Sequence, residues 1–361
     1  MSNLAIIDHY YEQLLQHEQP NKEKFLMDLA VQHPDIHEQI LQLLHDEEAD
    51  DFFNSIEKEV SLSFQGKCYD IGSEIGNYRL QEIVGTGGMS FVYRASRTDG
   101  LFQRDSAIKI VRKGLDSAKI IQYFKQECHI SAQLQHENIA RIYDGGITVD
   151  GLPYLVMEYI DGTDILEYCR QNQLDLNQRL KLFSQLCEAV QYCHDHGVIH
   201  CDLKPGNVLV NNKGEVKLTD FGIARHINNN SASILNTDQF RVLTLEYASP
   251  ELKTGSNITP SSDIYQLGLL LYEMITLEKA YKVALKNVKI GFKKIKIVPL
   301  KNLLLHCVHQ HADSRIDIEI LLATLKKIIS LIEIKNQVTN LKNRISDSLN
   351  QFIQLAAVFC F

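Results

Sequence analysis

The sequence at residues 200–207 reads HCDLKPGN and lies between two short apolar runs that predict β-strands. This spacing puts the carboxylate of Asp202, the ammonium of Lys204 and the amide of Asn207 on one loop. A carboxylate can accept a proton, an ammonium group binds phosphate, and an amide oxygen suits a hard divalent cation. We therefore expect this loop to carry phosphate and metal chemistry.

A second carboxylate motif follows 18 residues later. Asp220, Phe221 and Gly222 come directly after the apolar run 216–218, which predicts another short strand. At the end of that strand, Asp220 would supply a carboxylate for magnesium.

A glycine-rich stretch precedes both motifs. Residues 85–90 read GTGGMS and lie between two predicted strands. Glycines allow the backbone to approach phosphates and present N–H donors, although most glycine clusters are ordinary hairpin turns. A dinucleotide-binding fingerprint would lead from a strand into a helix, whereas a strand follows here, which argues against that alternative.

A lysine stands among apolar neighbours in the predicted strand 105–111. Burying Lys109 would be costly without a partner, although most strand lysines simply face water. The next predicted helix, 123–134, carries Glu127, which is the candidate partner.

In this order, the four motifs resemble those of the Ser/Thr protein kinase family, with wording similar to bacterial members. Ser249-Pro250-Glu251 stands where the family has Ala-Pro-Glu. Asp263 matches the Asp that anchors the catalytic loop, and Arg315 matches a late Arg that pairs with that Glu. The resemblance covers about 78 to 330. It implies an α+β, bilobal protein-kinase fold with a small β-rich N-lobe and a shortened α-helical C-lobe.

The resemblance also implies a role for each matched residue. Asp202 would be the catalytic base, Lys204 would neutralise the γ-phosphate, and Lys109, held by Glu127, would bind the α- and β-phosphates. ATP and Mg²⁺, with Mn²⁺ as an alternative, are the expected cofactors, and Asn207 and Asp220 the expected metal ligands. The residues expected around the nucleotide are Val84, Gly85, Thr86, Gly87, Gly88, Met89, Ser90, Phe91, Val92, Ala107, Lys109, Met157, Glu158, Ile160 and Leu209.

The sequence departs from the family pattern at three places. Cys201 stands where many members have the Arg that receives an activation-segment phosphate, and Ser131 replaces an apolar residue. Only 28 residues separate Leu277 from His306, and the stretch 278–301 carries a net charge of +7. Because residues 1–65 carry −11, the Lys-rich stretch is expected to dock them or another acidic partner.

Hydrophobic periodicity divides the chain into four parts. The expected parts are an acidic helical region 1–65, a linker 66–77, a kinase domain 78–330 with lobes 78–160 and 161–330, and a helical or apolar tail 331–361. The expected strands are 78–84, 91–95, 105–111, 139–143 and 154–159. The main expected helices are 123–134, 164–171, 176–196, 261–277 and 315–335.

Composition narrows the classes of function. The 361 residues carry a formal net charge of −8, so bulk nucleic-acid binding is not expected. No Cys-x-x-Cys pair, signal core or membrane-length apolar run is present, which indicates reduced thiols and a cytoplasmic location. Delivery to another cell as an effector stays open.

The resulting hypothesis is a Ser/Thr protein kinase that acts on protein hydroxyls. A pseudokinase or an ATP-binding adaptor that does not transfer phosphate is the main alternative. A small-molecule kinase of the same broad fold is a weaker one, because such enzymes usually lack the Lys204-Pro205 pairing.

Overall fold

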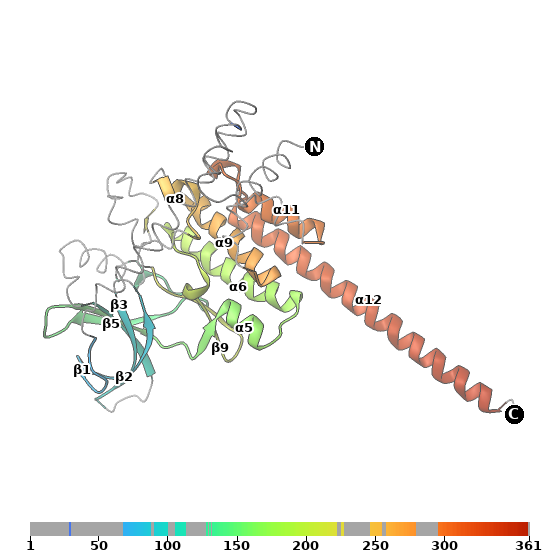
Figure 1. The fold of residues 1–361 in the computed structure, drawn as a ribbon, viewed down its shortest axis with the longest axis horizontal. Coiled ribbons are helices and arrows are strands. Elements are labelled where there is room, and N and C mark those ends of the chain that lie inside the picture. Colours follow the sequence, from blue (N-terminus) through green and yellow to red (C-terminus); the bar gives the residue numbers. More distant parts are fainter. Residues whose placement is uncertain are drawn as a thin grey trace.

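The computed structural model has a β-sheet lobe and a helical lobe, from which one long helix extends (Figure 1). It describes residues 68–87, 90–99, 105–112, 132–221, 225–226, 246–254, 258–278 and 295–359, and the single positions 29, 128 and 130. The α+β, bilobal fold expected from the sequence is confirmed.

The first lobe is a six-stranded antiparallel sheet in the order β1-β2-β3-β4-β6-β5. Its strands are β1 Glu74–Ile75, β2 Tyr78–Thr86, β3 Ser90–Arg97, β4 Asp105–Val111, β5 Ile142–Ile147 and β6 Pro153–Glu158. Tyr93, Ile108 and Val156, one from each of the three middle strands, are fully buried in a shared core. This core fixes β4 in the middle of the sheet, with Val92 and Leu155 opposite Lys109.

The strand expected at 139–143 begins later than predicted. Ile139 forms a parallel bridge with Leu218, and the Ala140 N–H donates to the Leu218 carbonyl at 2.9 Å. This short segment therefore pairs with the second lobe, and β5 starts only at Ile142. The apolar pattern could not distinguish these two partners.

The second lobe is built around buried helices. Its helices are α5 Ile165–Gln171, α6 Leu176–Asp195, α8 Pro250–Thr254, α9 Pro260–Thr276, α11 Val298–Cys307 and α12 Ile318–Phe359, with 3₁₀ turns η1 Pro205–Asn207 and η3 Ala312–Ser314. Asp175 and Gln178 form a capping box at the start of α6. A Cβ on Gly268 would lie 2.6 Å from the Cβ of Cys307, so glycine permits the close packing of α9 against α11.

Short strands carry the loops of the site. They are β7 Gly162–Asp164, β8 Val198–Ile199, β9 Val208–Asn211, β10 Val216–Leu218 and β11 Arg225–His226. β9 lies between β7 and β10, while β8 pairs with β11. The loop between β8 and β9 and the residues after β10 are thereby held next to each other.

α12 is one continuous helix of 42 residues. Its first half packs on α6 and α11. The expected domain boundary at residue 330 falls inside it, and at 1.5 Å per residue the helix is about 63 Å long.

Several expected features lie outside the described residues. They are Gly88, Met89, Glu127, Ser131 and Gly222, most of the helix expected at 123–134, residues 279–294 of the Lys-rich stretch, and residues 1–65 except Leu29.

Candidate active site

Lys109 and Asp220 form an ion pair between the two lobes. Lys109 lies on the central strand β4, and Asp220 lies two residues after β10; the Lys109 Nζ and Asp220 Oδ1 are 2.8 Å apart. Burial raises the pKa of the Asp220 carboxyl, but the charge and hydrogen bond of Lys109 lower it more, and Lys204 and His200 add to this effect. The pKa therefore lies below its ordinary value, and the carboxylate stays ionised.

Asp202 is held on one side only. Its Oδ2 accepts a hydrogen bond from Asn207 Nδ2 at 2.8 Å and lies 2.9 Å from Lys204 Nζ. Its Oδ1 is buried and has no hydrogen-bond partner among the described residues. Leaving a buried carboxylate oxygen without a donor costs free energy, so this atom is set up to accept a hydrogen bond from a bound molecule.

His200 connects the Asp202 loop to the residues before Asp220. Its Nε2 donates to the Thr219 carbonyl at 3.0 Å, and its Nδ1 accepts from the Asp202 N–H at 3.2 Å. The Thr219 N–H in turn donates to the Asn207 carbonyl at 2.9 Å. These contacts fix one neutral tautomer of the ring and keep the two carboxylate-bearing segments together.

α9 anchors the loop from below through buried polar side chains. The two oxygens of Asp263 accept the N–H groups of His200 at 2.9 Å and Cys201 at 2.8 Å. Gln266 accepts the Leu203 N–H and donates to the Cys201 carbonyl. Cys201 has a φ of 67° and Asp220 a φ of 59°, both in the left-handed region that non-glycine residues rarely adopt. The anchors stabilise this costly backbone shape.

The residues expected around adenine come from both lobes. Val92, Ala107 and Met157 pack in one apolar cluster beside β4. Leu209 lies on β9 of the second lobe, and Ile160 is buried after β6. Gly85, Thr86, Gly87, Ser90 and Phe91 lie at the β2–β3 turn, and Val84 is exposed on β2.

The sequence model of the protein kinase domain matches residues 78–354, which is most of the chain. The chain belongs to the protein kinase family.

Bacterial Ser/Thr kinases are among the relatives of this protein kinase chain. It is 39% identical over 201 residues to the probable serine/threonine-protein kinase PknB of Lactococcus lactis, covering 55% of this chain and 31% of that protein. It is 36% identical over 228 residues to the serine/threonine-protein kinase PrkC of Bacillus subtilis, covering 61% of this chain and 34% of that protein. The chain thus spans about a third of the length of these curated relatives.

The kinase fold brings Lys109, Asp220, Asp202, Lys204 and Asn207 together as the motifs require. The Lys109–Glu127 pair stays a prediction, because Glu127 lies outside the described residues.

Sequence reasoning missed a polar link at the connection between the kinase lobes. The Lys217 Nζ lies 3.0 Å from Glu158 Oε1, and both side chains are nearly buried. Glu158 Oε2 also accepts the Arg141 N–H at 3.2 Å. The only signal in the sequence was a lysine inside the apolar run 216–218, and nothing local identified its partner 59 residues away.

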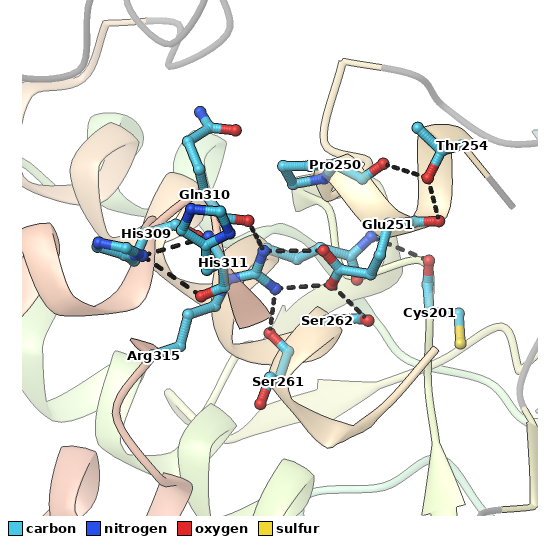
Figure 2. Close-up of polar contacts among 11 residues, drawn as sticks. Cys201, Pro250, Glu251, Thr254, Ser261, Ser262, His309, Gln310, His311 and Arg315 are labelled. Carbon is cyan, nitrogen blue, oxygen red and sulfur yellow. Dashed lines mark hydrogen bonds and ion pairs between the residues drawn. The ribbon is translucent and has the colours of Figure 1, made fainter. Parts of the chain in front are cut away.

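A second ion pair lies on the far side of the kinase loop, between α8 and the start of α12 (Figure 2). Arg315 donates to both oxygens of Glu251, at 2.6 and 2.8 Å, and Ser262 donates to Oε1 at 2.7 Å. Burial raises the pKa of Glu251, but the hydrogen bonds from Arg315 and Ser262 lower it to about 2. Arg315 also donates to three backbone carbonyls, which ties this end of the lobe together.

The donor set at the kinase site fits a magnesium ion. Asp220 and Asn207 offer carboxylate and amide oxygens, the hard ligands that Mg²⁺ prefers. The Asp220 side chain keeps 36% of its surface exposed, so a cation can reach the carboxylate. Among the described residues, no cluster of three or more His, Cys, Asp or Glu side chains could hold a metal alone, so a cation here needs further oxygens, such as those of phosphates.

Proposed function

We propose that this chain transfers the γ-phosphate of ATP to Ser and Thr hydroxyls of proteins. The observation that carries the proposal is Asp202, whose Oδ2 is held by Asn207 and Lys204 while its buried Oδ1 has no partner among the described residues. A substrate hydroxyl donating to Oδ1 would be oriented for attack and could lose its proton there. The names of the relatives, which are Ser/Thr kinases, agree with this proposal.

In the proposed reaction the hydroxyl oxygen forms a bond to the γ-phosphorus and the bond to the β–γ bridging oxygen breaks, which leaves ADP. Lys204 lies 2.9 Å from Asp202 and would offset the negative charge on the transferred group. Lys109 would hold the α- and β-phosphates in place. When bound at Asn207 and Asp220, Mg²⁺ would neutralise phosphate charge.

The test is transfer of label from radiolabelled ATP to a general protein substrate. Asp202→Asn keeps the size of the side chain but removes the proton acceptor, and we expect at least a ~10²-fold loss of rate. Asp313→Asn, at an exposed position on η3, is the matched control and should keep the wild-type rate. ATP binding by the wild type without any transfer would contradict the proposal and support the pseudokinase or adaptor alternative.

We also propose that the Lys-rich stretch 278–301 docks an acidic partner, with residues 1–65 as the first candidate. The support is the charge of +7 against −11. Deletion of residues 1–65 should change the activity or its dependence on salt. Kinetics that stay identical at low and high salt would contradict this docking.

Within the described residues, no helix combines the length and the apolar composition needed to cross a bilayer.

A further inference from the structure

The outer part of α12 leaves the body of the protein after Glu333 (Figure 1). Glu333 makes an ion pair with Lys181 on α6, with 2.6 Å between Oε1 and Nζ, and Ile332 is the last apolar residue that packs on the core. From Ile334 to Ile345, every side chain whose burial is described is exposed. A helix that projects this far needs a reason for its sequence.

That exposed part carries a regular apolar stripe. The stripe consists of Leu331, Ile334, Val338, Leu341 and Ile345, which are 47% to 62% exposed. Their spacings alternate between three and four residues, and every other residue from 333 to 344 is polar. This is the a and d pattern of a coiled coil, with Leu331, Val338 and Ile345 at position a.

The stripe faces away from the protein body. Leu321, Leu325 and Ile328, on the first half of the helix, are buried in the core of the second lobe. At 3.6 residues per turn, the stripe lies about 160° around the helix axis from these residues. Another helix can therefore lie along the stripe without meeting the body of its own subunit.

The width of the stripe distinguishes between kinds of partner. A seam limited to a and d positions suits one facing helix, whereas a membrane-surface helix has a broader apolar face and a strongly charged polar face. The polar positions here are mostly Asn, Gln, Ser and Thr. The sequence continues the a and d positions with Phe352, Leu355 and Phe359, and Ser348 is the one polar residue among them. Residues 331–359 thus make about four heptads, long enough for a coiled coil.

The charges beside the stripe select an orientation. Lys335 and Lys342 occupy position e, while Gln337 and Arg344 occupy position g. In a parallel, in-register pair, Lys342 faces Gln337 of the partner subunit and Lys335 faces Ser330 of the partner subunit, so no like charges meet. An antiparallel pair centred on the stripe would place Lys335 opposite Lys342 of the partner subunit, which is unfavourable.

We propose that residues 331–359 form a parallel two-stranded coiled coil with the same segment of a second copy of this chain. β-branched residues at a and leucine at d favour two strands, and Val338, Ile345 and Leu341 follow that rule. The chain's own acidic segment 1–65 is a poorer occupant, because Pro20 and Pro34 interrupt its helical periodicity before it could match four heptads. The proposal does not depend on kinase activity.

The test is the mass of the full chain in solution by sedimentation equilibrium, from low to high micromolar concentration. We expect a dimer for the wild type and a monomer for Val338→Glu combined with Leu341→Glu. The matched control is Thr339→Glu combined with Asn340→Glu, which adds the same charge on the polar side and should stay dimeric. Far-UV circular dichroism and the melting temperature would show that all three chains fold.

Orientation is tested with one introduced cysteine. In a Cys68→Ser, Cys360→Ser background, Val338→Cys should oxidise to a covalent dimer, because a residues meet in a parallel pair, and Thr339→Cys should not. A wild type that is monomeric throughout, or a dimer that survives the two glutamates, would overturn the proposal. Dimerisation that appears only after deletion of residues 1–65, or a monomer that binds anionic phosphatidylserine vesicles, would assign the stripe to another occupant and also overturn it.

Discussion

The molecule contains two carboxylate–cation groups on opposite sides of the catalytic loop, and they differ in how completely they are satisfied. Glu251 has both oxygens occupied by Arg315 and Ser262, and the Arg315 side chain is fully buried. Asp202 has one oxygen held and one buried oxygen without a partner among the described residues. A saturated carboxylate can only hold the structure together, whereas an unsatisfied one can act on a bound molecule.

The strongest test of this comparison replaces the cation of the saturated pair. Arg315→Met leaves the Glu251 carboxylate buried without its cation, and we expect a loss of ~3–5 kcal/mol in the free energy of unfolding, measured by urea denaturation. Arg315→Lys should lose less, because it keeps the charge but cannot bind both oxygens in the same way. A loss below ~1 kcal/mol for Arg315→Met would show that the pair contributes little to the fold.

The matching change at the open site should affect rate and not stability. Lys109→Met removes the cation beside Asp220, and we expect a ~10²- to 10³-fold lower rate of phosphate transfer with ATP. The free energy of unfolding should change by ~1 kcal/mol or less, since the Asp220 side chain is partly exposed and water can solvate it. Strong destabilisation by this variant would remove the distinction between the two groups.

A smaller effect should appear in the pH dependence of stability. Because the folded pKa of Glu251 is lowered to about 2, its stabilising contribution is present above its ordinary pKa and is lost as the pH falls toward 2. Below about pH 4, the wild type should lose up to ~1.4 kcal/mol per pH unit relative to Glu251→Gln, which cannot titrate. Unfolding free energies measured from pH 5 to pH 3 that run parallel for the two chains would contradict this.

The sequence predicted the local elements well because their signals are short-range. The apolar runs gave β4, β6, β9 and β10, and Asp175 with Gln178 marks the start of α6. The residues of the catalytic loop followed from one motif. Its anchor Gln266 and the Lys217–Glu158 pair were not predicted, since their contacts span about 60 residues and no local pattern connects the two ends.

Two further outcomes show where pattern reasoning ends. The helix expected at 315–335 runs to Phe359, because nothing in residues 336–359 breaks a helix, although their exposed apolar side chains had suggested a separate tail. The late start of β5 depended on a choice between two apolar partners for Ile139, which only the three-dimensional arrangement decides.

The bridge between Ile139 and Leu218 has a mechanical consequence. Asn138 and Ala140 hydrogen-bond to Leu218 on both sides, at 2.8 and 2.9 Å, so any rotation of one lobe against the other pivots near this point or breaks it. Asp220, two residues along, would hardly move. β2 lies four strands from β5, about 19 Å away, so a turn of about 10° would shift it by about 3 Å. The protein can thus open and close over a nucleotide like a lever while its metal-side carboxylate stays in place.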